Sequence, residues 1–243
     1  MSTLAIIPAR GGSKGIPNKN LTWVGDKRLI DYTIEASQNS KCLNRIILSS
    51  DDKTIIEYCT NRGIISPFIR PPELSDDKAN MIDVVKHALQ WLKENEEYIP
   101  NIVVLLQPTS PLRSAGDIDD ALSLMQHLNV ESLISVNEML EHPQECICEE
   151  NGSWFKLLKQ KNSSHQRQDY IGNYYFINGA IYAFTPKFLQ AHGSLTKPGK
   201  QTALYKMPPD RSIDIDTFDD LHRAESYISN SDLRLSLQNP ILE

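Results

Sequence analysis

The feature that most constrains the fold is a regular alternation of short apolar runs with stretches of helical periodicity. Strands are predicted at residues 4–7, 45–49, 102–106, 132–136 and 179–184, with a further extended segment at 64–69. Helices are predicted at residues 29–40, 80–95 and 117–128, and another, capped by Ser50 or Asp51, ends at 61. Strands joined by helices predict an α/β fold of three layers around a mainly parallel sheet.

The alternation breaks between about residues 138 and 176, where the chain is polar and mixed. Asn151-Gly152 is typical of a tight hairpin turn inside this stretch. We therefore predict one domain over residues 1–229, with an inserted subdomain at about 138–176. Residues 230–243 are expected to form a loosely ordered tail.

Composition narrows the class of protein. The chain has 243 residues and a net charge of −6, which argues against non-specific binding of nucleic acid. No apolar run is long enough to span a membrane, and Pro8 and Arg10 interrupt the first one too early for a signal peptide. The four cysteines match no zinc or redox spacing, so we expect reduced thiols and a cytoplasmic location.

A glycine-rich loop follows the first predicted strand and carries Arg10, Lys14 and Lys19. Glycines let backbone N–H groups approach phosphate oxygens, and the cations neutralise them, so the loop is suited to a triphosphate. The spacing does not fit a Walker A motif, because Ile16 stands where that motif needs glycine. It does not fit the dinucleotide fingerprint either, because Ser13 stands at a glycine position of that motif. The alternative is a solvated turn rich in Gly and Lys.

A second polar loop, residues 107–113, follows the most apolar strand. Two prolines stiffen it and present Gln107, Thr109, Ser110 and Arg113 as hydrogen-bonding groups. In α/β sheets, ligands bind at the carboxyl ends of strands, which favours a binding role for this loop. The alternative is an ordinary connection in which Ser114 caps the next helix.

A pair of carboxylates, Asp214 and Asp216, alternates with Ile213 and Ile215. In an extended segment the two carboxylates point to one side while the isoleucines seal the core. Mg²⁺ is often held by one or two carboxylates together with substrate phosphates, so this pair is a candidate magnesium site. The alternative, that Asp216 or Thr217 caps a helix beginning near residue 218, explains only one member of the pair.

Other polar groups give weaker signals. Arg167, Gln168 and Asp169 form a cluster in the inserted segment that, by itself, is typical of a solvated surface. The six histidines show no metal-ligand spacing, and no Ser/His/Asp or Cys/His arrangement is apparent.

Taken together, these segments resemble the acylneuraminate cytidylyltransferase family, including the bacterial enzymes that activate legionaminic acid. Six motifs occur in the family's order and cover about residues 3–228; they lie at residues 9–20, 70–74, 105–113, 167–169, 178–182 and 212–217. The resemblance implies a Rossmann-like nucleotidyltransferase fold. It also implies transfer of CMP from CTP to the anomeric hydroxyl of a nonulosonic acid, with release of pyrophosphate and with Mg²⁺ as cofactor.

The resemblance also implies roles for individual residues. The nucleotide would be bound by Arg10, Ser13, Lys14, Lys19, Asn20, Arg70, Asp77 and Asn80. The sugar would be bound by Gln107, Thr109, Ser110 and Asn178. Catalysis would depend on Arg167, Lys19 and Asp214, and the metal on Asp214 and Asp216. The group that removes the hydroxyl proton stays open between Asp214 and metal-bound water.

The inserted segment implies a homodimer, because in relatives it forms a dimer interface and reaches the partner's active site. Departures from the family's pattern fall on the sugar side: Gln144 and Glu145 after His-Pro, Met81, and Phe176-Ile177 before Asn178. An apolar Met81 would suit a less hydroxylated sugar such as a 9-deoxy legionaminic type. Two alternatives stay open, namely another acid sugar such as Kdo, and a nucleotide-binding regulator without turnover.

Overall fold

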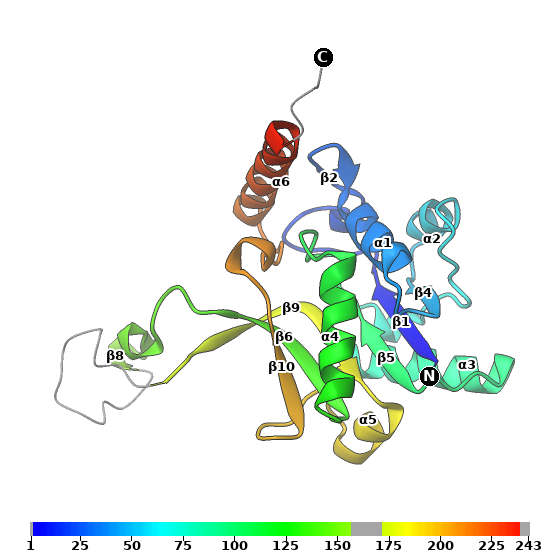
Figure 1. Ribbon diagram of the computed structural model, residues 1–243. Helices are drawn as coiled ribbons and strands as arrows, with labels where there is room; N and C mark the ends of the chain where they lie inside the picture. The colour runs from blue at the N-terminus through cyan, green and yellow to red at the C-terminus, as the bar shows by residue number, and fades with distance from the viewer. Residues whose placement is uncertain (1, 157–171, 239–243) are drawn as a thin grey trace.

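A computed structural model of the chain describes residues 2–156 and 172–238. Six strands form one sheet in the order β10-β6-β9-β5-β1-β4 (Figure 1). The strands are β1 Thr3–Pro8, β4 Arg45–Ser49, β5 Ile102–Leu105, β6 Ser132–Glu138, β9 Tyr175–Phe184 and β10 Thr202–Lys206. All neighbours run parallel except β9, which is antiparallel to β5 and β6 because it returns beside β6 after the inserted segment. The mainly parallel sheet is confirmed.

Helices cover both faces of the sheet, which confirms the three-layer prediction (Figure 1). The α-helices are α1 Leu29–Asn39, α2 Lys53–Thr60, α3 Met81–Glu96, α4 Ala115–His127, α5 Pro186–His192 and α6 Phe218–Gln238. Helices α1, α2 and α4 pack on one face, and α3 and α5 pack on the other. Short 3-10 helices lie at Lys19–Leu21, Pro72–Leu74, Pro143–Glu145 and Pro209–Arg211.

Strand β1 shows why the sheet is buried on both sides. All six of its residues are buried, with Ala5 and Ile7 in the clusters under α1 and α4 and Leu4 and Ile6 in the cluster under α3 and α5. A parallel strand covered by helices on both faces reads as a continuous apolar run, as this one does. The polar residues that follow it are therefore confined to the exposed end of the strand.

The prediction that Ser50 or Asp51 caps the second helix is wrong. Asp52 is the cap, because its carboxylate accepts hydrogen bonds from the N–H groups of Thr54 and Ile55. Asp51 instead accepts from the N–H of Gly11, 3.0 Å away, and so anchors the glycine loop. The segment predicted as extended at 64–69 forms only an isolated parallel bridge between Ile47 and Ile65.

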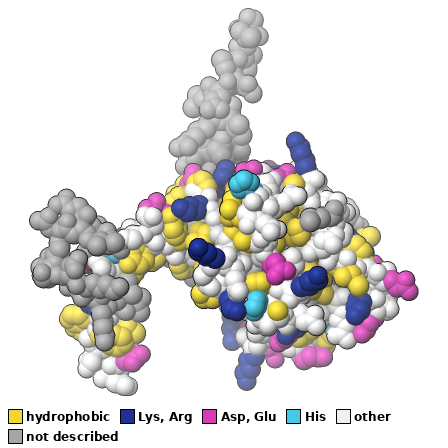
Figure 2. All heavy atoms as spheres, turned by 60° about the horizontal axis from the view of Figure 1, so that its bottom comes forward, with side chains coloured by type: hydrophobic (Ala, Val, Ile, Leu, Met, Phe, Trp, Pro, Cys, Tyr) yellow, Lys and Arg dark blue, Asp and Glu magenta, His cyan; other side chains and the backbone are white. Residues whose placement is uncertain are grey.

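An arm leaves the body between β6 and β9 and ends in the hairpin of β7 Ile147–Glu150 and β8 Ser153–Lys156 (Figure 1). Asn151 and Gly152 both have positive φ angles, 53° and 75°, at the predicted tight turn. Figure 2 shows the arm standing away from the body with hydrophobic side chains on it. Residues 157–171 of the inserted segment lie outside the described part of the chain.

Helix α6 runs through Gln238, so regular backbone continues into the region expected to be a loose tail. Its buried residues Leu221 and Ala224 pack with Ile213 and Ile215 and with Ile16 of the glycine loop. A small sheet of β2 Trp23–Val24 and β3 Lys27–Arg28 completes this cluster through Val24. The cluster brings the first and last predicted motifs together.

Candidate active site

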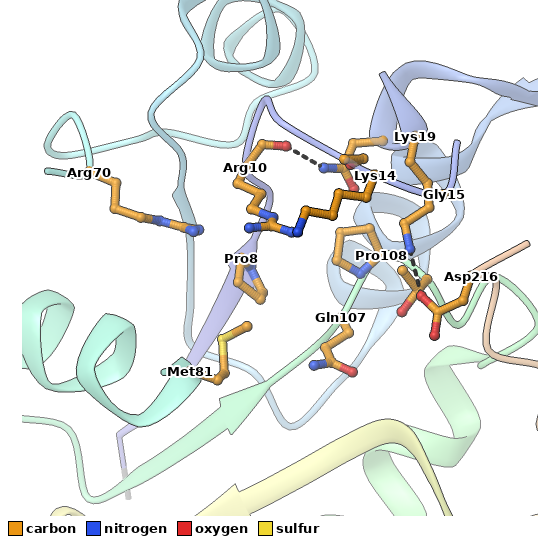
Figure 3. Close-up of a pocket in the computed structure, with 13 residues that line it drawn as sticks. Pro8, Arg10, Lys14, Gly15, Lys19, Arg70, Met81, Gln107, Pro108 and Asp216 are labelled. Carbon is orange, nitrogen blue, oxygen red and sulfur yellow. Dashed lines mark hydrogen bonds and ion pairs between the residues drawn. The ribbon is translucent and has the colours of Figure 1, made fainter. Parts of the chain in front are cut away.

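A cavity of about 270 Å³ opens where β1 and β5 end, at the carboxyl edge of the sheet (Figure 3). Ligands bind at this edge in open α/β sheets. The cavity is lined by Pro8, Arg10, Ser13, Lys14, Gly15, Lys19, Asn20, Arg70, Met81, Gln107, Pro108, Thr109 and Asp216. Four of the six predicted motifs, at residues 9–20, 70–74, 105–113 and 212–217, therefore meet here, together with Met81 at the start of α3.

The glycine loop is folded tightly over the segment that carries the two carboxylates. Gly15 lies against the carbonyl oxygen of Asp216, so that a Cβ at this position would overlap it. The side chain of Asn20, which is 6% exposed, donates to the carbonyl of Arg10 over 3.0 Å and closes the loop on itself. These contacts leave the cationic side chains of the loop directed into the cavity (Figure 3).

Each cation of the loop is paired with an aspartate. Arg10 Nη2 and Lys14 Nζ lie 2.9 Å and 2.8 Å from the carboxylate of Asp77. Lys19 Nζ lies 2.8 Å from Asp216 Oδ1 and donates to the carbonyl of Ile215 over the same distance. The hydrogen bonds from Lys14 and Arg10 hold the pKa of Asp77 below its ordinary value. The loop thus concentrates positive charge whose present partners are carboxylates.

Arg70 supplies a fourth cation from the other wall of the cavity (Figure 3). Its guanidinium is buried and donates to the hydroxyl and carbonyl of Ser49 at the end of β4. Burial lowers the pKa of Arg70 to about 10, which still leaves it charged near neutral pH. Within residues 2–156 and 172–229 it forms no ion pair, so its charge is available to an anion in the cavity.

The two carboxylates alternate with buried isoleucines as the sequence predicted. Ile213 and Ile215 are 5% and 0% exposed, whereas Asp216 faces the cavity. Burial raises the pKa of Asp214, and the charge of Asp216 adds to this, while the Thr109 hydroxyl opposes it. Asp214 Oδ1 is buried and has no hydrogen-bond partner among the described residues. An unpartnered, buried carboxylate oxygen beside a second carboxylate fits a divalent cation.

The alternative prediction, that Asp216 or Thr217 caps the following helix, is confirmed for Thr217. Its hydroxyl accepts from the N–H of Asp220 over 3.3 Å, and the Asp220 carboxylate accepts from the N–H of Thr217 over 3.0 Å. Capping therefore uses Thr217 and leaves Asp214 and Asp216 for other roles. Within the described part of the chain, no group of three His, Cys, Asp or Glu gathers as a ready metal site, so substrate oxygens would have to complete the coordination.

The predicted site residues divide into those that line the cavity and those that do not. Arg10, Ser13, Lys14, Lys19, Asn20, Arg70, Gln107, Thr109 and Asp216 line it. Asp77 reaches the cations from the loop before α3, and Asn80 caps α3 by accepting from the N–H of Ile82. Ser110 is buried, and its hydroxyl has no partner among the described residues.

Asn178 is 1% exposed, and its amide is used inside the sheet. Its Oδ1 accepts from the Ser135 hydroxyl over 2.6 Å, and its Nδ2 donates to the Ser212 hydroxyl over 3.1 Å. The side chain therefore joins β6, β9 and the segment before Asp214 rather than lining the cavity. Of the other two predicted site residues, Asp214 is not part of the cavity lining, and Arg167 lies outside the described residues.

The cavity is also lined by Pro8, which the sequence analysis did not single out, and by Gly15 and Pro108, which it used only as parts of their loops. These residues contribute ring atoms and backbone, so they carry no chemical signature of a site. Their positions beside the ends of β1 and β5 were the available signal, because that edge was already expected to bind ligands.

No helix among the described residues is long and apolar enough to cross a membrane. Cys42, Cys59, Cys146 and Cys148 form no disulfide bond.

Comparison with solved structures shows the fold. A CMP:2-keto-3-deoxy-manno-octonic acid synthetase complexed with CTP superposes with a TM-score of 0.67 at 15% identity, covering 95% of this chain and 100% of that one. A 4-diphosphocytidyl-2C-methyl-D-erythritol synthase from Anaerococcus prevotii gives 0.64 at 16% identity, covering 94% and 98%. The Rossmann-like architecture predicted for this chain is thereby confirmed.

Similarity in sequence is closer. The chain is 34% identical over 223 residues to an N-acylneuraminate cytidylyltransferase of Streptococcus agalactiae, covering 90% of this chain and 52% of that protein, so it spans about half the length of that relative. It is 33% identical to a pseudaminic acid cytidylyltransferase of Campylobacter jejuni, covering 93% and 95%. It is also 33% identical to a CMP-N,N'-diacetyllegionaminic acid synthase of Legionella pneumophila, covering 89% and 92%. A family profile described as cytidylyltransferase matches residues 4–182, and the chain therefore belongs to the cytidylyltransferase family.

Proposed function

We propose that this protein transfers CMP from CTP to the anomeric hydroxyl of a nonulosonic acid. The hydroxyl oxygen forms a bond to the α-phosphorus of CTP, the bond to pyrophosphate breaks, and the hydroxyl proton is lost. The observation that carries the proposal is the meeting, in one cavity, of four cations with Asp216 and the polar loop of Gln107 and Thr109. The names of the Streptococcus, Campylobacter and Legionella relatives support the same reaction.

The cations would act by positioning and neutralising the triphosphate. Phosphoryl transfer needs little covalent chemistry from the protein, so placement and charge supply most of the rate. Arg10, Lys14 and Lys19 now hold carboxylates, and phosphate oxygens would replace these. Lys14 is 77% exposed, so this exchange requires no opening of the core.

Asp214 and Asp216 would hold Mg²⁺, and the bound ion would supply positive charge to the phosphates and acidify the attacking hydroxyl. The free, buried Oδ1 of Asp214 supports this assignment. Lys19 lies beside Asp216 and would keep the phosphates close to the two carboxylates. Either Asp214 or water would take the proton from the hydroxyl.

The sugar would lie toward Gln107 and Met81, on the wall of the cavity away from Lys14 and Lys19 (Figure 3), with Thr109 also in the lining. An amide and a hydroxyl can recognise the carboxylate and hydroxyls of such a sugar. Met81 places an apolar side chain on this wall, which favours a substrate of the legionaminic type with a methyl group where sialic acid has a hydroxyl.

The arm supports a homodimer. Leu140, Ile147, Trp154, Phe155 and Phe176 are exposed on or beside it, and such a patch on a soluble protein marks an interaction surface. The family resemblance gives Arg167 a catalytic role in this segment. Free thiols at all four cysteines support a cytoplasmic location.

A product assay tests the function. Purified protein, CTP and Mg²⁺ are incubated with N-acetylneuraminic, legionaminic or pseudaminic acid or with Kdo, and pyrophosphate and CMP-sugar are measured by mass spectrometry. We expect turnover with a nonulosonic acid and none without Mg²⁺. Turnover with Kdo alone would favour the eight-carbon alternative. Binding of CTP without any product would favour a regulator.

A further inference from the structure

Arg113 is a buried cation that the proposed reaction leaves unused. Its side chain is 2% exposed, and burial lowers its pKa to about 9. Among the described residues it forms no ion pair, although the charge of Asp117 acts on it and opposes the effect of burial, and its Nε has no partner. Burying a charge without a carboxylate partner costs free energy of folding, so this guanidinium must be held by well-placed neutral acceptors.

The acceptors belong to three different elements. Arg113 Nη2 donates to the Thr33 hydroxyl of α1 over 2.6 Å. Arg113 Nη1 donates to the carbonyl of Ala180 in β9 over 2.7 Å and to the carbonyl of Gln107 over 3.2 Å. The planar guanidinium therefore joins α1, β9 and the polar loop at fixed angles, which a single ammonium group could not do.

Gly179 shows why the relation between β9 and the polar loop matters. Four residues of β9, 178–181, face the single residue Ser135 of β6, and within this bulge Gly179 has φ of +73°. A Cβ on Gly179 would lie 2.8 Å from Gln107 Oε1 and 3.5 Å from Asp214 Oδ2. The Gln107 amide and the Asp214 carboxylate thus both lie in the space that a side chain at residue 179 would need.

From this arrangement we infer that Arg113 is a positioning residue for the sugar side of the site. It fixes the backbone of Gln107 to that of Ala180, next to Gly179, and so sets where the Gln107 amide lies relative to Asp214. Arg113 does not line the cavity and would contact neither substrate. The consequence for turnover rests on the proposed function; the consequence for the loop does not.

The test compares two variants. Arg113→Met keeps the length of the side chain but has no hydrogen-bond donor, and Arg113→Lys keeps the charge but lacks the planar guanidinium. Met125→Ala is the matched control, because Met125 is equally buried, lies in α4 and lines no part of the cavity. Kinetics with CTP and the sugar, CTP affinity by calorimetry, melting temperature and hydrogen exchange are measured for each variant.

We expect Arg113→Met and Arg113→Lys to lower kcat/KM for the sugar about 100-fold, as a displacement of about 1 Å does. The affinity for CTP should change less than about threefold, because no cation of the glycine loop contacts Arg113. Met125→Ala should lower the melting temperature without lowering kcat/KM for the sugar more than the affinity for CTP. Hydrogen exchange should increase in residues 107–113 and 178–182 in the Arg113 variants and not in the control.

Equal losses for CTP and sugar, or full activity in Arg113→Lys, would mean that Arg113 is only structural. Unchanged hydrogen exchange of residues 107–113 would overturn the inference even if the wild-type protein proved inactive. A wild type that releases no pyrophosphate, with increased exchange in the variants, would instead refute the proposed function alone.

Discussion

The two sides of the cavity hold their polar groups in opposite ways. On the glycine-loop side, Arg10 and Lys14 reach Asp77 through ion pairs whose members are 32% to 77% exposed. On the other side, the buried Arg113 holds Gln107 through hydrogen bonds to backbone and to Thr33. Exposed ion pairs are weak and readily exchanged in water, whereas a buried hydrogen-bond network is costly to disturb. In the proposed reaction, the glycine-loop side would therefore exchange its carboxylates for phosphate oxygens, and the side of Gln107 would stay fixed.

The largest effect is expected from Asp214→Asn, which removes the negative charge of the buried carboxylate on the fixed side. We expect kcat to fall about 1000-fold, at the upper end for loss of one electrostatic group. Activity is measured by pyrophosphate release, with Asp210→Asn as the control for an exposed carboxylate nearby.

The same substitution should raise stability when Mg²⁺ is removed with a chelator. Burial raises the pKa of Asp214 above its ordinary value. At pH values between the ordinary and the raised pKa, the folded protein therefore holds a proton that the unfolded chain has lost. The free energy of unfolding falls as the pH rises through this interval. Asn carries no charge, so the melting temperature at neutral pH should rise by a few degrees. Mg²⁺ should stabilise the wild type more than the variant; equal stabilisation would contradict the metal assignment.

The next largest effect is expected from Lys19→Ala, which removes a cation from the exchangeable side. Lys19 is the least exposed cation of the loop and contacts the Asp216 carboxylate, so its loss should lower kcat/KM for CTP about 100-fold. Lys27→Ala is the control, because Lys27 pairs with Glu35 outside the cavity. If both variants behaved alike in steady-state kinetics, Lys19 would have no special role.

A smaller effect, confined to the sugar, is expected from Gly179→Ala. The added Cβ would displace the Gln107 amide, so kcat/KM for the sugar should fall about 10- to 100-fold while CTP affinity is kept. Gly193→Ala is a matched control, because Gly193 also has positive φ and nothing lies within 4 Å of its added Cβ. Backbone strain is common to both variants, so any difference in kinetics reports the contacts of the added Cβ with Gln107, at 2.8 Å, and with Asp214, at 3.5 Å.

The smallest effect, and the one with a diagnostic sign, is expected from Asp77→Asn. If Asp77 competes with phosphate for Arg10 and Lys14, the variant should lower KM for CTP about threefold at low salt, and less at high salt. Asp83→Asn, which removes a comparable exposed partner on α3, should leave KM unchanged. A rise in KM would show instead that Asp77 itself binds the nucleotide.

Sequence patterns predicted the strands β1, β4, β5, β6 and β9, the helices α1 to α4 and the loops that meet at the cavity, whereas strand β10 and helix α5 were not predicted. The correct predictions succeed because apolar runs, capping residues and glycine turns act on neighbouring residues. The cap of α2 was misplaced because Ser50, Asp51 and Asp52 are all competent caps, and only the contact of Asp51 with Gly11 removes one of them.

The direction of β9 and the partners of the cations could not be predicted. Nothing in residues 175–184 specifies antiparallel pairing, which follows from the return of the chain beside β6. The pairing of Asp77 with Arg10 and Lys14 joins residues more than sixty positions apart, and Arg113 reads in sequence as one more polar residue of its loop.

By itself, the sequence determined the order of elements, the cationic glycine loop and the alternation of Asp214 and Asp216 with isoleucines. Only the tertiary structure decided that Asn178 is used within the sheet and that Gly179 leaves room for Gln107 beside Asp214. The physical reason is the distance along the sequence over which each kind of interaction acts. Propensity and periodicity act over a few neighbouring residues, whereas burial and hydrogen-bond partners depend on which distant segments the sheet brings to one edge.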